Sequence, residues 1–149
     1  MAAGTFTLYN HVAASIGDGT IDLDGDTFKI ALLDSGYTPS AAHDEWADVS
    51  GDEIANGAGY TTGGGTLTGV TWGQTGGVST FDSDNFVWTA SGGSITARYA
   101  VINDVTANKL IGYYLLDTAP ADITATDGNT FTVGPHASNG WFQLTVNPA

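Results

Sequence analysis

The sequence predicts a mainly β protein: a single-domain antiparallel β-sandwich or barrel with a short N-terminal helix. Short runs of alternating apolar and polar residues recur along the chain, and glycine-containing turn pairs separate them at regular intervals. A chain of 149 residues is long enough to bury one core, and it shows no internal repeat or linker. We therefore expect one domain over 1–149, with a helix or arm at 1–17 and a β body at 18–149.

The N-terminal segment has the spacing of an amphipathic helix. Phe6, Tyr9 and Ile16 share one helical face, Thr5 stands where an N-cap is needed, and Gly17 would end the helix. Two interpretations stay open. The helix packs on its own sheet, or it is an arm whose Phe6 and Tyr9 contact a neighbouring subunit.

The β body opens with the clearest strand of the sequence. Residues 27–33 place Phe28, Ile30 and Leu32 on one face and further apolar residues on the other, so this strand is expected to be central. Residues 42–49 are expected to make two helical turns. Further strands are expected at 66–71, 86–90, 95–103, 109–117, 130–133 and 141–146.

The charge of the chain excludes several classes of partner. Sixteen Asp and Glu stand against three fixed cations, Lys29, Arg98 and Lys109, for a net charge of −13. Binding to a phosphate backbone draws its free energy from clustered Lys and Arg, which this chain lacks. Anionic membranes are excluded for the same reason. No long apolar run and no basic segment followed by an apolar one is present, so we expect neither a membrane span nor an export signal.

An acidic segment before the first strand is the strongest candidate for a cation site. Asp18, Asp22, Asp24 and Asp26 alternate with glycine, and carboxylate oxygens are the ligands that Ca²⁺ prefers. The spacing fails for an EF-hand, because Leu33 stands where the loop needs a bidentate glutamate. A solvated acidic turn explains the residues more simply. Whether Asp22, Asp24 and Asp26 hold a cation stays open.

Nothing in the sequence predicts an enzyme. The chain has no cysteine, its serines lie in no nucleophile elbow, and His11, His43 and His136 lack the spacing of a zinc site. We therefore expect no catalytic residue, no metal and no cofactor. The aromatic residues, among them Trp88 and Trp141, are expected to fill the core. The alternative is that they form a carbohydrate-stacking platform.

Arg98 is the only arginine and stands in an otherwise apolar strand. A half-buried guanidinium needs carboxylate or carbonyl partners. The favoured interpretation is a clamp within the domain, and the alternative is a salt bridge between subunits. Together with Phe6 and Tyr9, Arg98 is thus a candidate subunit-contact residue.

Three blocks of sequence follow one another within residues 21–117. The first is FKIALLDSGYTP at 28–39, followed by AHD at 42–44. The second is GYTTGG at 59–64, leading to LTG at 67–69. The third is FVW at 86–88, followed by SITARYAVI at 94–102. Their order and spacing resemble a pattern in small virion structural proteins of tailed bacteriophages. The resemblance covers most of the chain and implies a structural role without catalysis.

The role that the resemblance implies is capsid decoration, also called cement. We expect such a protein on the outer capsid surface of the virion, where it would bridge major capsid protein subunits as a homotrimer or in clusters at symmetry axes. Two alternatives stay open: a tail-associated structural protein and a carbohydrate-binding module.

Overall fold

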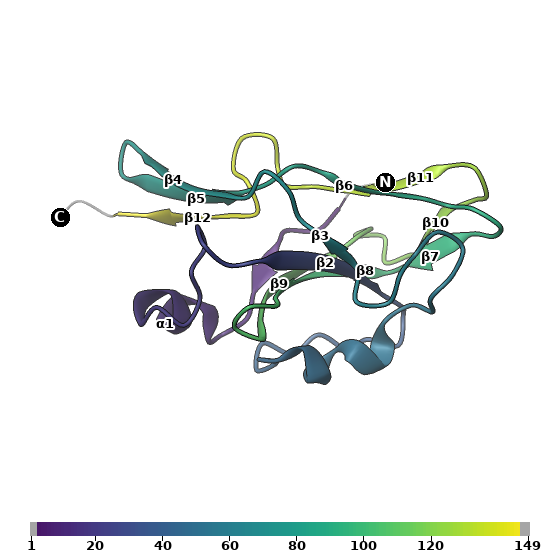
Figure 1. Cartoon of the computed structure of the whole chain (residues 1–149), viewed down its shortest axis with the longest axis horizontal. Helices are drawn as coiled ribbons and strands as arrows, with labels where there is room; N and C mark the ends of the chain where they lie inside the picture. The colour runs from purple at the N-terminus through teal and green to yellow at the C-terminus, as the bar shows by residue number, and fades with distance from the viewer. Residues whose placement is uncertain (1–2, 147–149) are drawn as a thin grey trace.

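The computed structural model describes residues 3–146, which form a layered β structure (Figure 1). A five-stranded antiparallel sheet lies in the middle. Two smaller antiparallel sheets lie over one of its faces, and a short helix with two 3-10 turns lies over the other. The mainly β fold class with a short N-terminal helix is confirmed. The layers form a sandwich-like arrangement, and no closed barrel is present in residues 3–146.

The elements follow in chain order. They are β1 (Thr7–Leu8), α1 (Val12–Gly17), β2 (Phe28–Leu33), the 3-10 turns Trp46–Asp48 and Ser50–Asp52, β3 (Gly65–Thr66), β4 (Thr71–Thr75), β5 (Val78–Asp82), β6 (Phe86–Thr89), β7 (Ile95–Ala97), β8 (Tyr99–Asp104), β9 (Lys109–Leu115), β10 (Ile123–Ala125), β11 (Thr130–Val133) and β12 (Phe142–Thr145).

The middle sheet has the strand order β1-β9-β8-β2-β3. Strand β2 is buried on both faces, as its sequence predicted: Phe28, Ile30 and Leu32 enter one hydrophobic cluster, and Ala31 and Leu33 enter another. Alternation along the strand sends successive side chains to opposite faces. A strand buried in this way reads as a nearly continuous apolar run.

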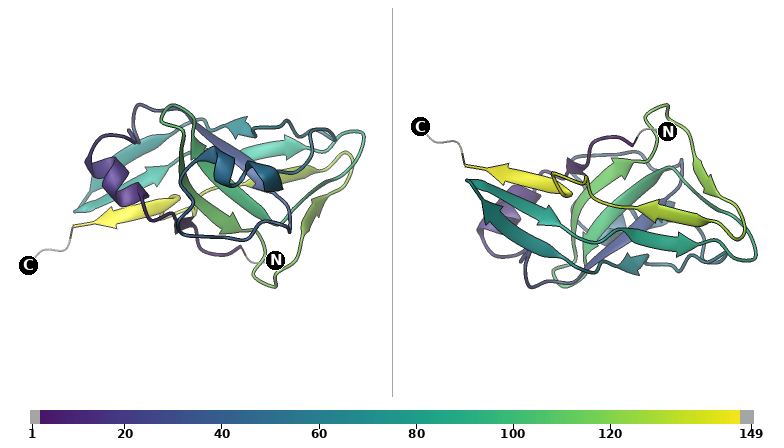
Figure 2. Two further views of the ribbon diagram at one scale, coloured as in Figure 1. Left: turned by 90° about the horizontal axis from the view of Figure 1, so that it is seen from below. Right: turned by 90° about the horizontal axis from the view of Figure 1, so that it is seen from above.

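The larger cluster lies between the middle sheet and the layer of smaller sheets. That layer holds the β4–β5–β12 sheet at one end of the molecule and the β6–β11 sheet at the other (Figure 2). The ring centroids of Phe28 in β2 and Phe81 in β5 are 5.1 Å apart, in an edge-to-face contact that joins the two layers. The small β7–β10 sheet lies next to the start of β8, because only Arg98 separates β7 from β8.

The smaller cluster lies under the opposite face of the middle sheet. Tyr9, Val12, Tyr37 and Val49 are each at most 3% exposed there. Of the two helical turns expected at 42–49, the structure has one, the 3-10 turn Trp46–Asp48, and the second 3-10 turn, Ser50–Asp52, lies beyond the predicted range. This segment closes the lower face of the sheet.

The N-terminal helix is shorter than expected, and the prediction of one helical face that includes Phe6 and Tyr9 is wrong. Thr7 and Leu8 form β1, which pairs with Tyr113 and Gly112 of β9. Pairing with the edge of the sheet satisfies backbone groups that an isolated helix end would leave to water. Phe6 and Tyr9 consequently enter the two different hydrophobic clusters.

Several expected strands are confirmed and others need correction. Residues 86–90, 109–117, 130–133 and 141–146 contain β6, β9, β11 and β12. The strand expected at 66–71 is wrong in extent, because strand pairing stops after Thr66 and resumes at Thr71. The strand expected at 95–103 is broken at Arg98. Strand β5 and strand β10 were not predicted, since neither carries a clear alternation.

Tyr60 ties the glycine-rich segment to the middle sheet. Its hydroxyl donates to Glu53 Oε1 at 2.7 Å and accepts the backbone N–H of Leu32 at 3.1 Å. The N–H of Gly63 donates to the same glutamate oxygen at 2.6 Å. Burial, and then the hydrogen bond to Glu53, raise the pKa of Tyr60, so the phenol stays protonated.

We expect Tyr60→Phe to lower the free energy of unfolding by about 1 to 2 kcal/mol, because the N–H of Leu32 loses its partner in a buried position. Urea unfolding measures the change. Tyr113→Phe is the matched control, since the structure of residues 3–146 gives the Tyr113 hydroxyl no hydrogen bond. An equal loss in both variants would contradict the assignment.

Candidate interaction site

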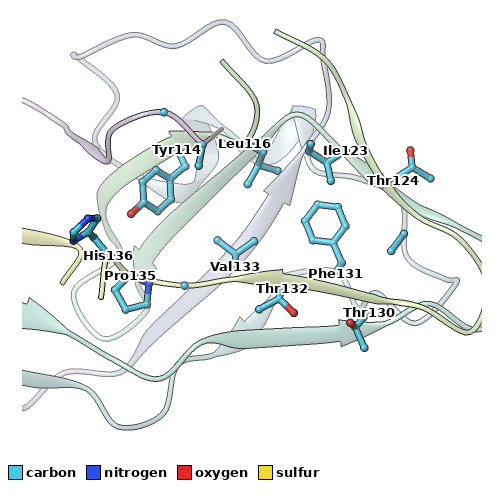
Figure 3. A pocket seen from close by; sticks show the side chains of 14 residues that line it. Tyr114, Leu116, Ile123, Thr124, Thr130, Phe131, Thr132, Val133, Pro135 and His136 are labelled. Atoms are coloured by element: carbon cyan, nitrogen blue, oxygen red, sulfur yellow. The ribbon is translucent and has the colours of Figure 1, made fainter. Parts of the chain in front are cut away.

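A concave apolar groove is present between two layers of the fold (Figure 3). It has a volume of about 690 Å³ and lies between the end of β9 and strand β11. Tyr114 and Leu116 face Phe131 and Val133 across it, and Ile123 lines it as well. We name this site the β9–β11 groove.

The β9–β11 groove has a mainly apolar lining with a few polar groups. Its polar groups are the hydroxyl of Tyr114, the imidazole of His136 and threonines at its rim. Burial raises the pKa of Tyr114, so its hydroxyl stays a neutral donor. Among the described residues, no carboxylate lines the groove.

Arg98 is held inside its own chain. Its Nε donates to Asp122 Oδ1 at 2.8 Å, and its side chain is 27% exposed. Its backbone groups also join two segments, because its N–H donates to Leu33 and its carbonyl accepts from Leu116. The structure therefore shows the clamp that the sequence favoured.

Lys109 is also paired within the chain. Its Nζ lies 2.9 Å from Asp44 Oδ2 and 3.7 Å from Glu45 Oε1, and His11 Nε2 lies 3.3 Å from the other Asp44 oxygen. The hydrogen bond to Asp44 raises the pKa of Lys109. Two of the three fixed cations are thus occupied by the chain's own carboxylates.

A buried carboxyl pair lies at the end of β8. Asp104 is fully buried, and its Oδ1 accepts the backbone N–H groups of Thr106 and Ala107. Its Oδ2 has no hydrogen-bond partner in residues 3–146, and the carboxyl of Asp26 is close enough to interact with that of Asp104. Burial first, and then Asp26, raise the pKa of Asp104 from 3.8 to about 6.

The acidic segment before β2 is folded by its own carboxylates. Asp22 Oδ1 accepts from the backbone N–H groups of Asp24 and Gly25, and Asp26 Oδ2 accepts from the N–H of Asp22. In the part of the chain from residue 3 to 146, no three His, Asp or Glu side chains gather as they would around a metal ion. The carboxylates of Asp22 and Asp26 therefore cap a turn.

The aromatic residues lie mostly in the core. Trp88 and Trp141 are 5% and 3% exposed, and Trp141 Nε1 donates to Ser83 Oγ at 2.9 Å. Neither indole offers a free face on which a sugar ring could stack. Trp46 and Trp72 are half-buried.

The predicted subunit-contact residues are not gathered in one place. Phe6 packs against Tyr114 and Trp141, with ring centroids 5.1 and 5.4 Å away. Tyr9 donates to or accepts from the hydroxyl of Tyr37 at 2.9 Å in the other cluster. Their own chain already buries both rings, so they have little surface left to give to a neighbouring subunit.

Sequence reasoning missed the β9–β11 groove and the Asp104 pair. Residues from the N-terminal segment, β9, β10 and β11 line the groove, and no local sequence pattern indicates that these segments lie together. Asp104 carried no local signal either, because aspartate is mostly exposed and the residue before it in β8, Asn103, is polar as well.

Comparison with protein-family models, with characterised proteins and with solved structures found no match to this chain. Within residues 3–146, no helix has the length and apolar character needed to cross a membrane.

Proposed function

We propose that the chain is a non-enzymatic structural protein of a tailed-bacteriophage virion, a capsid decoration protein that binds the outer shell and bridges major capsid subunits. Such a protein stabilises the shell by binding its assembled form more tightly than its separate parts. The partner is the major capsid protein, and the bound unit is a homotrimer or a cluster at a symmetry axis.

The observation that carries this proposal is that the three sequence blocks that resemble virion structural proteins lie next to one another in the fold. The first block pairs with the third along β2 and β8, where Ile30 lies opposite Ile102. The second block joins the first through the hydrogen bond from Leu32 to Tyr60. The blocks thus form one connected unit, as expected of a pattern that specifies a fold shared within a family.

The electrostatics support a position outside the shell. With Arg98 and Lys109 paired internally, the net charge of −13 is left largely uncompensated. A surface of this charge repels packaged DNA and attracts a basic protein surface. A position in the tail is equally compatible with this negative charge. The cryo-electron microscopy experiment below distinguishes the two positions. The stacking faces that a carbohydrate-binding module needs are not offered by the buried Trp88 and Trp141.

Cryo-electron microscopy of the virion that carries the chain tests the proposal. We expect copies of this β fold on the outer shell at symmetry axes, in numbers that match the capsid lattice. Virions that lack the gene serve as the control and should lose that density and open at a lower temperature. Density for the chain in the tail alone would overturn the capsid position.

A further inference from the structure

The β9–β11 groove runs along the edge of strand β11. Every residue from 130 to 136 lines the groove, although consecutive side chains in a strand point to opposite faces. A groove that both sets of residues line follows the edge of the strand rather than lying beneath one face. All three residues of β10 (Ile123–Ala125) line it in the same way. The groove therefore lies between the edges of two strands (Figure 3).

The backbone of β11 is unpaired on the side of the groove. Strand β11 pairs with β6, and no second strand in residues 3–146 pairs with it. The N–H of Ala90 donates to the carbonyl of Asn129 at 2.8 Å, one position before Thr130 in the ladder. Opposite residues of an antiparallel ladder alternate between hydrogen-bonded and non-bonded pairs. Phe131 therefore bonds to β6, and the backbone groups of Thr130 and Thr132 point away from β6.

This free edge has none of the features that usually prevent strand addition. Strand β11 contains no proline and no charged residue, and its register with β6 is continuous without a bulge. Proteins commonly block an exposed edge with such features, because unpaired N–H and C=O groups pair readily with a strand from another chain. The edge of β11 is therefore suited to receive a strand.

The interior of the groove suits apolar side chains. Leu116 and Ile123 lie on one side of it, and Phe131 and Val133 point toward them from the other (Figure 3). The volume of about 690 Å³ lies within the usual range of binding pockets, roughly 300–1,000 Å³. No lysine, arginine, aspartate or glutamate of residues 3–146 lines the groove. A phosphate or another charged group would therefore find no partner there.

An extended polypeptide segment satisfies both features at once. Its backbone can pair with Thr130 and Thr132, and every second side chain can enter the groove, as in other cases of strand addition. A small apolar molecule would fill the groove but would leave the backbone of β11 unpaired. A second copy of this chain is disfavoured, because each copy carries a net charge of −13 and the two would repel each other.

We propose that the β9–β11 groove binds an extended segment of a partner protein, which adds a strand to the free edge of β11 and places alternate apolar side chains in the groove. The inference deepens the proposed function and rests on it for the identity of the partner as the major capsid protein. Strand addition itself is tested without the capsid.

The first test uses a fluorescently labelled synthetic peptide of alternating valine and threonine with a lysine at each end, and anisotropy measures its binding. We expect the wild-type chain to bind this peptide with its valines in the groove. The matched control is the same peptide N-methylated at its threonines, the residues that would lie opposite Thr130 and Thr132. It keeps every side chain but loses the N–H groups that pair with β11, so it should bind at least tenfold more weakly.

The second test changes the edge of β11. Thr132→Pro removes an N–H that points away from β6, so proline is tolerated there, and binding should weaken at least tenfold. Thr132→Ala is the matched control, because it keeps that N–H and should bind like the wild type. Circular dichroism and thermal unfolding check that both variants are folded.

The third test changes the interior of the groove and does not depend on a proline. Ile123→Ser should weaken binding about tenfold, because the contact loses one apolar side chain. Val105→Ser is the matched control. Val105 is 41% exposed in the turn between β8 and β9, outside the groove, so its replacement should leave the affinity unchanged.

Three results would overturn the inference. They are no binding of the unmethylated peptide to the wild-type chain, equal binding of the two peptides, and equal binding to Ile123→Ser and Val105→Ser. Light scattering tests the choice of occupant. A dimer of the wild-type chain that Thr132→Pro dissociates would show that a second copy, rather than a partner protein, occupies the groove.

Binding of the same variants to capsids stripped of the chain separates this inference from the proposed function. Capsid binding that is lost in Ile123→Ser and kept in Val105→Ser supports both. Capsid binding that both variants keep overturns the groove as the capsid-binding site and leaves the virion role intact. Peptide binding in the groove without capsid binding by the wild-type chain supports strand addition and overturns the capsid role.

Discussion

Replacing Asp104 by asparagine is expected to stabilise the protein at pH 8 by about 2 to 3 kcal/mol. Burial and the neighbouring Asp26 raise the pKa of Asp104 from 3.8 to about 6. The folded protein therefore binds this proton more tightly than the unfolded chain does. The contribution of the protonated Asp104 carboxyl to the stability of the fold is complete below about pH 3.8 and is lost as the pH rises through about 6.

The geometry explains why asparagine fits. Its oxygen can accept hydrogen bonds from the N–H groups of Thr106 and Ala107 as Asp104 Oδ1 does, and its NH₂ can donate to Asp26.

At pH 4 the wild-type carboxyl is mostly protonated, so the variant should gain little stability there. Urea unfolding at both pH values measures the difference. Asp24→Asn is the control, and its effect should be small and alike at both. An Asp104→Asn protein less stable than wild type at pH 8 would contradict the pair repulsion.

Replacing Gly64 by alanine is expected to cost more than about 4 kcal/mol or to prevent folding. Gly64 has a φ of +71°, and a Cβ there would overlap the carbonyl oxygen of Ile30 and lie 2.8 Å from the Cα of Ala31. Both atoms belong to the backbone of the central strand β2 and cannot turn aside. The substitution would therefore push β3 away from β2.

The adjacent Gly63 provides the matched control. Its φ is +89°, yet the nearest atom to an added Cβ is the flexible Lys29 Nζ at 4.0 Å. Gly63→Ala should cost only the strain of a left-handed backbone, about 1 to 2 kcal/mol. Thermal and urea unfolding of the two variants give the comparison. Equal losses would show that backbone conformation alone, and not the close approach to β2, requires Gly64.

Local pattern was enough to predict the parts of the fold that depend on neighbours in sequence. Strand β2, buried on both faces, and the turn at Gly76 and Gly77 follow from alternation and from glycine's access to positive φ. The N-terminal segment shows where this reasoning fails. Phe6 and Tyr9 have helical spacing, but the free edge of β9 offers backbone hydrogen bonds that a lone helix cannot match.

The functional sites also combine features that local sequence predicts with features that only the tertiary structure sets. Spacing alone was enough to reject an EF-hand at Asp22, and the carboxylates there do cap a turn. The exposure of Leu144 followed from no local feature, because an alternating strand of this composition is normally covered.

The sequence by itself determined the mainly β class, the central strand and the strongly negative charge, because each depends on composition or on residues close along the chain. The tertiary structure alone decided which rings share a cluster, where Asp104 meets Asp26, how Arg98 and Lys109 are paired, and which sheet faces stay uncovered. These features arise where distant segments meet, and the pairing of strands, rather than any local preference, sets those meetings.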